Sequence, residues 1–126
     1  MRLYVAGPMR AIPHYNFPDF DATAADLRAQ GHDVVSPTDI DREHGFDAMT
    51  LPPDSDWNAF PPGLTFEIVM ERDLAAVRTC EGLVLLPGWQ HSVGTNMELD
   101  EAKRLGLQVF GYFKHENDER GDLVEL

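Results

Sequence analysis

A serine, a glycine and a glutamate follow one another in the stretch 83–105, where an apolar strand is predicted to lead into a helix. Glu98 is expected in the first turn of that helix, at the carboxyl end of a buried strand, where open α/β sheets bind their ligands. Ser92 and the backbone N–H groups around Gly94 would lie beside the positive end of the helix dipole, which suits a phosphate. The spacing therefore predicts a nucleophile next to an anion-binding site.

A second interpretation of Glu98 is structural. The pattern Thr95-x-x-Glu98 matches a capping box, in which the glutamate side chain reaches back to the N–H of Thr95 and does no chemistry. The helix dipole favours an ionised Glu98 in either case. Position alone does not separate the two interpretations.

A second acidic candidate is Asp73, within a predicted helix. It comes one residue before Leu74, which is expected to face inward, so Asp73 could point into a cleft. The alternative is a solvated helix face that Asp73 shares with Glu71 and Arg72, as is common for a run of charges.

A basic candidate follows the first predicted strand. Gly7 lets a ligand approach the backbone closely, and the Arg10 guanidinium could pair with a phosphate through two hydrogen bonds. The alternative is a turn that ends the strand and carries a solvated arginine.

Cofactor motifs are absent from the sequence. The five histidines show no metal-ligand spacing, and Cys80, the single cysteine, cannot build a thiolate zinc site. No GxGxxG follows the first strand, which argues against a dinucleotide fingerprint. We therefore expect neither a metal nor another cofactor.

The apolar pattern predicts the elements that position these residues. We expect strands over 3–6, 34–35, 83–86 and 108–113, and helices over 17–30, 64–79 and 95–105. Asn16 is the expected N-cap of the first helix and Gly31 its C′ residue. The expected inward positions of the second helix are Leu64, Ile68, Leu74 and Val77.

Strands that alternate with helices predict an α/β fold. We expect one domain over 1–126, with a Rossmann-like (flavodoxin-like) parallel sheet of four to five strands and helices on both faces. Residues 36–63 hold five of the nine prolines together with Phe46, Trp57 and Phe60. This segment is predicted to be a lid or a subunit-interface loop. Residues 114–126 are expected to form an acidic tail that is frayed apart from its apolar end, Leu123, Val124 and Leu126.

Composition limits the function classes. The formal charge of −12, from 22 acidic and 10 basic residues, would repel a nucleic-acid backbone, although local donors can still bind a small phosphorylated ligand. A lone cysteine fits a reducing compartment. We see neither a signal peptide nor a membrane-spanning stretch, and expect a cytoplasmic protein without a membrane partner.

Four segments occur in order along the chain: YVAGPMR, NFPDF, ERDL followed by CEGLVLL, and GWQHSVGTNMEL before LGLQVFGYF. With them the chain resembles the nucleoside 2-deoxyribosyltransferase-like superfamily. The pattern is most similar to the branch that includes the 2′-deoxynucleoside 5′-phosphate N-hydrolases and the CMP N-glycosidases. ERDL together with S-x-G-x-x-x-E-L is the most specific part, and the resemblance covers most of the chain outside the Pro-rich segment and the tail.

The resemblance implies roles for individual residues. Glu98 occupies the position of the glutamate that attacks C1′ of the sugar, and Asp73 that of the aspartate that assists proton transfer. Ser92 and the Gly94 backbone match the phosphate-binding loop of the monophosphate hydrolases, and Arg10 matches an arginine after the first strand. The N-terminal motif contains Tyr4, Gly7 and Pro8, with Gly7 lining the ligand.

These residue types suit cleavage of an N-glycosidic bond. A carboxylate beneath C1′ can stabilise an oxocarbenium-like state or bond to it, and a second carboxyl group with a raised pKa can protonate the departing base. The leading expectation is therefore hydrolysis of a nucleoside 5′-monophosphate. In this superfamily a second subunit often completes the site, so the resemblance implies a homodimer or a higher homo-oligomer. The alternatives are deoxyribosyl transfer between bases and a catalytically silent nucleotide-binding protein.

Overall fold

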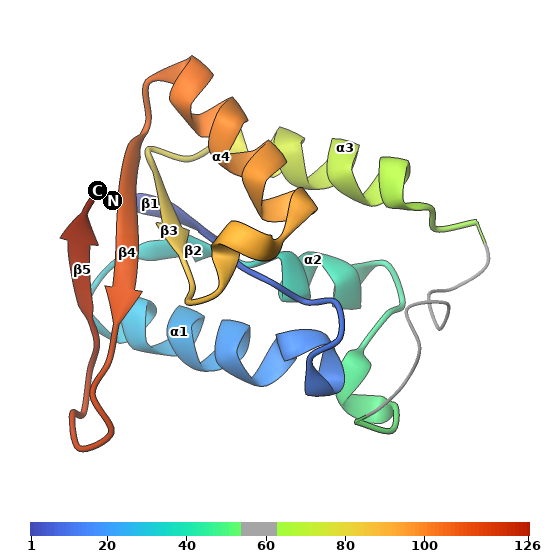
Figure 1. Cartoon of the computed structure of the whole chain (residues 1–126), viewed down its shortest axis with the longest axis horizontal. Coiled ribbons are helices and arrows are strands. Elements are labelled where there is room, and N and C mark those ends of the chain that lie inside the picture. Colours follow the sequence, from blue (N-terminus) through green and yellow to red (C-terminus); the bar gives the residue numbers. More distant parts are fainter. Residues whose placement is uncertain (54–62) are drawn as a thin grey trace.

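A computed structural model describes residues 1–53 and 63–126 of the chain. In this part, five strands form a single sheet in the order β2-β1-β3-β4-β5 (Figure 1). The strands are β1 (Arg2–Ala6), β2 (Asp33–Val35), β3 (Gly82–Leu85), β4 (Gln108–Phe113) and β5 (Asp122–Glu125). The helices are α1 (Phe17–Ala29), α2 (Pro37–Glu43), α3 (Phe66–Val77) and α4 (Val93–Leu105), with short 3-10 turns η1 (Pro13–Asn16), η2 (Ala48–Thr50) and η4 (Trp89–His91).

The sheet confirms the predicted Rossmann-like α/β fold. Strands β1 to β4 pair in parallel, and β5 pairs antiparallel with β4 at the edge. The chain adds β2 on one side of β1 and β3 on the other, so the direction of winding reverses between β1 and β3. Open α/β sheets bind their ligands beyond the carboxyl ends of the strands at such a switch point.

Helices cover both faces of the sheet. Successive side chains of β1 point to opposite faces, so this strand packs against both layers. Leu3 and Val5 pack on one face against Phe20 and other residues of α1. Tyr4 and Ala6 point to the other face, which α3 and α4 cover (Figure 1). Strand β1 is therefore buried on both sides, and Tyr4 is directed toward the two helices that carry the predicted acids.

Helix α1 begins and ends where the sequence predicts. Asn16 is its N-cap residue, but no hydrogen bond from a helix N–H reaches the Asn16 side chain, which instead donates to the Pro8 carbonyl at 2.9 Å. Asn16 thus ties the start of α1 to the loop after β1. Gly31 follows the C-cap with a φ of 95°, as predicted for a C′ glycine.

The first part of segment 36–63 is a helix and not the loop that we predicted. Ser36 is the N-cap of α2, and its Oγ accepts a hydrogen bond from the N–H of Thr38. Pro37 occupies the first position of the helix, where a missing N–H does no harm. Ser-Pro was therefore a helix start. The lid or interface prediction for Trp57, Phe60 and the rest of 54–62 lies outside the described residues.

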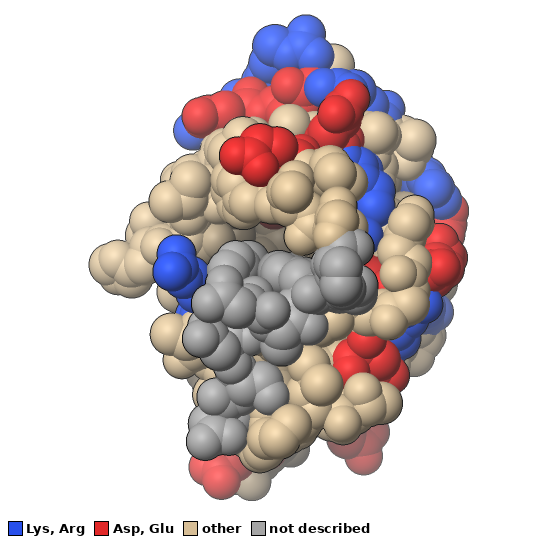
Figure 2. Space-filling model, turned by 90° about the vertical axis from the view of Figure 1, so that its right-hand side faces the viewer, with Lys and Arg blue, Asp and Glu red and all other residues tan. Residues whose placement is uncertain are grey.

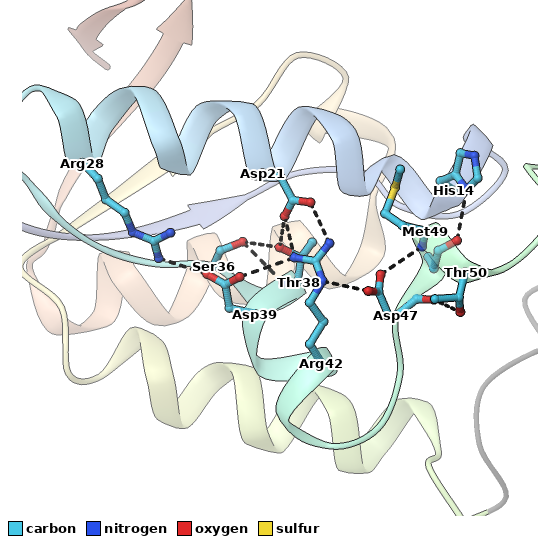
Figure 3. A network of polar contacts seen from close by, with 11 residues as sticks. His14, Asp21, Arg28, Ser36, Thr38, Asp39, Arg42, Asp47, Met49 and Thr50 are labelled. Carbon is cyan, nitrogen blue, oxygen red and sulfur yellow. Dashed lines mark hydrogen bonds and ion pairs between the residues drawn. The ribbon is translucent and has the colours of Figure 1, made fainter.

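Arg42 holds α2 against α1 (Figure 3). Its guanidinium donates to both carboxylate oxygens of Asp21, at 2.9 and 2.7 Å, and lies 5.1 Å from the centre of the Phe17 ring. The Nε of Arg42 also pairs with Asp47 at 3.3 Å. This network fixes α2 beyond the carboxyl ends of β1 and β2.

The apolar end of the tail, which was not expected to fray, returns to the sheet as β5 (Asp122–Glu125). Leu123 packs against the α1 side of the core. Asp26 of α1 accepts hydrogen bonds from the Tyr112 hydroxyl and, at 2.7 Å, from the Gly121 N–H. Only one face of this strand is covered, so its sequence holds few apolar residues and the strand is hard to predict from the sequence. None of the described helices is long and apolar enough to cross a membrane.

Candidate active site

A cavity of about 250 Å³ lies between α3, α4 and the loop after β1, close to the lower end of the range of roughly 300–1,000 Å³ typical of small-molecule sites. Seven of the eight predicted site residues line it: Gly7, Pro8, Arg10, Asp73, Ser92, Gly94 and Glu98. The eighth, Tyr4, lies behind Glu98 in the core. The tertiary structure thus brings all the predicted residues to one place.

The α3 helix presents Asp73 to this cavity. Thr65 caps the helix by accepting a hydrogen bond from the Ile68 N–H at 3.2 Å. The buried positions are Met70, Asp73 and Val77. Of the four predicted inward positions, Val77 is buried and Leu64 and Leu74 are half-buried, but Ile68 is 49% exposed, so the prediction was wrong at Ile68. The solvated interpretation of Asp73 was also wrong, because its residue surface is only 6% exposed.

The α4 helix begins three residues earlier than a capping box at Thr95 requires. Ser92 is the N-cap, and its Oγ accepts hydrogen bonds from the N–H and the hydroxyl of Thr95, at 3.2 and 2.9 Å. Glu98 is therefore in the second turn, not the first, and does not cap the helix. This position turns Glu98 toward the sheet, where it is 5% exposed.

Glu98 is held by β1. The hydroxyl of Tyr4, a fully buried residue, donates a hydrogen bond to Oε2 of Glu98. Burial and the charge of Glu98 raise the pKa of Tyr4, so the phenol remains a hydrogen-bond donor. Because the bond engages Oε2, the other carboxylate oxygen of Glu98 is available to the cavity.

The two acids differ from ordinary surface carboxylates. Burial raises the pKa of Glu98 well above its usual range, the charge of Asp73 raises it further, and the Tyr4 hydrogen bond offsets part of this effect. Burial raises the pKa of Asp73 to about 7, although Arg72 acts in the opposite direction. Two nearby acids with raised pKa values can hold a proton near neutral pH, as acid catalysis requires.

The N-terminus of α4 provides donors for an anion at the same cavity. Val93 and Gly94, the first two residues of the helix, line the cavity, and their N–H groups have no acceptor within the helix. The Ser92 oxygen already accepts two hydrogen bonds, which leaves its own hydrogen free to donate. Arg10 is exposed at the rim and has no hydrogen bond or ion pair within residues 1–53 and 63–126.

Two glycines allow close packing around the cavity. A Cβ on Gly7 would lie 2.7 Å from the Leu86 Cβ, so this glycine is needed for the approach of β1 to the end of β3 as well as for access to a ligand. A Cβ on Gly94 would lie 3.2 Å from the Met70 sulfur, where α4 approaches α3. A larger residue at either position would narrow the cavity.

Sequence reasoning missed the apolar part of the lining. These residues are Met9, Phe20, Pro37, Phe66, Val69 and Met70, and the lining also includes His91, Val93 and Thr95. Phe66 and Met70 precede Asp73 at helical spacing and could have been recognised once the register of α3 was known. Figure 2 shows that most of the described side chains around the centre of this face are uncharged, and that the charged ones lie mainly toward its edges.

A buried ion cluster behind Asp73 was also missed. Arg72 contacts Asp73, with Nη2 3.3 Å from its Oδ1, and also forms an ion pair with Asp41 of α2. No group of three or more His, Cys, Asp or Glu residues in the described part of the chain could hold a metal ion.

Comparison with known proteins places the chain in one family. The model of the family described as "Domain of unknown function (DUF4406)" matches residues 1–111. That match covers most of the chain, so this protein belongs to the DUF4406 family. Among curated proteins, no match was found.

Proposed function

We propose that this protein hydrolyses the N-glycosidic bond of a nucleoside 5′-monophosphate, giving the free base and a (deoxy)ribose 5-phosphate. The observation that carries the proposal is the arrangement of two buried acids, Glu98 and Asp73, beside the N-terminus of α4 in one cavity. The acids suit the glycosidic carbon, and the helix N-terminus suits the phosphate. The resemblance to the nucleoside 2-deoxyribosyltransferase-like superfamily supports the same assignment.

The phosphate would bind at the first turn of α4. The N–H groups of Val93 and Gly94, the Ser92 hydroxyl and the Arg10 guanidinium supply donors from the loop and the helix. Glu98 lies one turn further along the same helix, so a phosphate held at the N-terminus directs the sugar toward the carboxylate. An unphosphorylated nucleoside would leave these donors without a partner.

Cleavage would proceed in two steps. In the first, the free oxygen of ionised Glu98 attacks C1′, the glycosidic bond breaks, and its electron pair goes to the base nitrogen. Asp73 donates the proton that the departing base requires. In the second, Asp73 takes a proton from water, the water oxygen attacks C1′, and the bond to Glu98 breaks. One water is consumed, and both carboxyl groups return to their starting states.

Tyr4 would orient the nucleophile. Its hydrogen bond to Oε2 of Glu98 fixes the rotation of the carboxylate and favours the ionised form, against the effect of burial. The corrected start of α4 also supports catalysis over a silent binding role, because Glu98 no longer serves as a helix cap. Deoxyribosyl transfer would use the same residues, with a second base in place of water.

The test is a chromatographic assay for released base. Purified protein is incubated with a panel of ribo- and deoxyribonucleosides and their 5′-monophosphates, beside the Glu98→Gln variant. Gln retains an acceptor for Tyr4 but cannot act as the nucleophile, so release should fall to background. The matched control is Glu71→Gln, which makes the same change at an exposed position of α3 and should leave the rate unchanged.

The outcomes separate the candidates. Release from monophosphates and not from nucleosides supports the proposal. Formation of a new nucleoside after addition of a free base would identify a transferase. Wild-type rates in Glu98→Gln would overturn the nucleophile assignment, and binding without release from any substrate would indicate a silent nucleotide-binding protein.

A further inference from the structure

The Asp41–Arg72–Asp73 cluster connects α2 to α3 behind the cavity. Arg72 donates through Nη2 to both carboxylates, forming a hydrogen bond with Asp41 and one of 3.3 Å with Oδ1 of Asp73. The three side chains are 3%, 14% and 9% exposed, in chain order. One guanidinium thus serves two buried carboxylates, and only Asp73 among the two lines the cavity.

The Arg72 guanidinium is not fully satisfied. Its Nη1 is buried and has no hydrogen-bond partner within the described residues. Arg72 is the one side-chain hydrogen-bond partner that the described part of the chain offers the Asp41 carboxylate, so α2 delivers this acid to the cation behind the site. If Asp41 were absent, the whole charge of Arg72 would act on Asp73, because no other described carboxylate is paired with it.

We propose that Asp41 is a positioning residue that shares the Arg72 guanidinium with Asp73 and thereby leaves Asp73 able to carry the proton that the departing base requires. This inference rests on the proposed function. An aspartate paired with an undivided arginine charge holds its ionised form strongly and is a poor proton donor near neutral pH. When Asp41 shares the Arg72 charge, Arg72 lowers the pKa of Asp73 less. The negative charge of Asp41 itself also raises the pKa of Asp73.

Other titratable or charged groups lie around Asp73, and a substitution of Asp41 leaves them in place. They are Glu98 from α4 and Tyr4 from β1, whose charges interact with Asp73, and Arg10 and His91, which line the same cavity. A change of Asp41 alone therefore isolates the contribution of α2.

The direct test follows the Asp73 carboxyl carbon by NMR as a function of pH, in the full chain without ligand. The signal is assigned by its loss in Asp73→Asn. In Asp41→Asn the titration midpoint of Asp73 should fall by about one pH unit or more, since the arginine charge is no longer shared. In Arg72→Gln the midpoint should rise, because the cation is removed. Asp39→Asn is the control: it makes the same change on α2, at a half-exposed residue that contacts Arg28 and Arg42 but not Arg72.

Shifts in opposite directions are not expected of a merely structural pair. An Asp73 midpoint that is the same in Asp41→Asn as in Asp39→Asn would overturn the inference. If Asp41→Asn does not fold, Arg72→Gln decides, and an unchanged midpoint there overturns it.

The activity profile provides the second readout. The pH at which kcat/KM declines on the alkaline side should follow the Asp73 midpoint in each variant, with little change in KM. If no nucleotide is hydrolysed but the midpoint shifts as described, the proposed function fails and the coupling of Asp41 to Asp73 stands. If nucleotides are hydrolysed and the alkaline limb does not move in Asp41→Asn, the positioning role is wrong and the proposed function survives.

Discussion

Two arginine–aspartate clusters flank α2, and the same chemical groups behave differently in them. Around Arg42, half-exposed carboxylates surround one cation, and the hydrogen bonds from Arg42 and Thr38 outweigh partial burial and lower the pKa of Asp21 (Figure 3). Around Arg72, burial dominates, and the pKa of Asp73 is raised to about 7. The number of paired charges does not decide the outcome; access to water does, because desolvation penalises the ionised form.

This contrast assigns the clusters different tasks. The Arg42 cluster favours the ionised form of Asp21 and joins α1 to α2, which is a structural task. The Arg72 cluster keeps an acid that can hold a proton at a cavity, which is useful for proton transfer and costly for stability. The following predictions test that division, beginning with the largest expected effect.

Asp73→Asn should abolish most of the catalysis and leave the fold intact. Asn cannot donate a proton to the departing base, so kcat/KM for the preferred nucleotide should fall by about 10²–10⁴-fold. In the proposed mechanism Asp73 is the acid, and its pKa is raised to about 7, so wild-type kcat/KM should decline as the pH rises through that value. The measurement is the pH profile of both proteins; a wild-type rate in Asp73→Asn would remove the aspartate from the mechanism.

Arg42→Ala should destabilise the protein more than it impairs the chemistry. The change removes a two-pronged pair with Asp21 and the contact with the Phe17 ring, at a cost of about 1–2 kcal/mol in the free energy of unfolding after allowance for solvent screening. Urea unfolding measures the loss. Arg78→Ala, which removes the hydrogen bond of a more exposed arginine to Glu101, is the control and should cost clearly less. Equal losses would mean that the Arg42 network has no special structural role.

The smallest effect is a difference in sign between two pH dependences. The folded-state pKa of Asp73, about 7, lies above the ordinary value of 3.8, so wild-type protein loses stability as the pH rises between these values. Asp73→Asn does not titrate and should gain in Tm relative to wild type across that window. Asp21 has a lowered pKa and contributes stability above 3.8 that is lost as the pH falls through its folded-state pKa. Asp21→Asn should therefore lose in Tm relative to wild type as the pH rises through the acidic range.

Thermal unfolding of the three proteins from acidic to neutral pH measures both slopes. Parallel slopes for the two variants would contradict the contrast between the clusters, because they would place Asp21 and Asp73 in equivalent environments.

The predictions from sequence succeeded where short-range patterns decide the outcome. The continuous apolar runs predicted β1, β3 and β4, and helical spacing of apolar residues predicted α1. Gly31 marks the end of α1 because few other residues adopt its backbone conformation. Most of the motif residues at the cavity could also be predicted, since they lie directly after a strand or within a helix that follows one, whereas Tyr4 lies within β1 and was expected only from the family resemblance. Helix starts were less certain: Ser36 and Ser92 were both overlooked as N-caps.

Only the tertiary structure decided the partners of the charged and polar side chains. The hydrogen bond between Tyr4 and Glu98 joins residues 94 positions apart, and the pair of Arg72 and Asp41 joins residues 31 positions apart. The sequence by itself determined the α/β order of the elements and the residue types available at the strand ends, because these depend on neighbours along the chain. The inward register of α3, the cluster behind Asp73 and the raised pKa values depend on which helices exclude water from one another, and that is settled only when the elements pack.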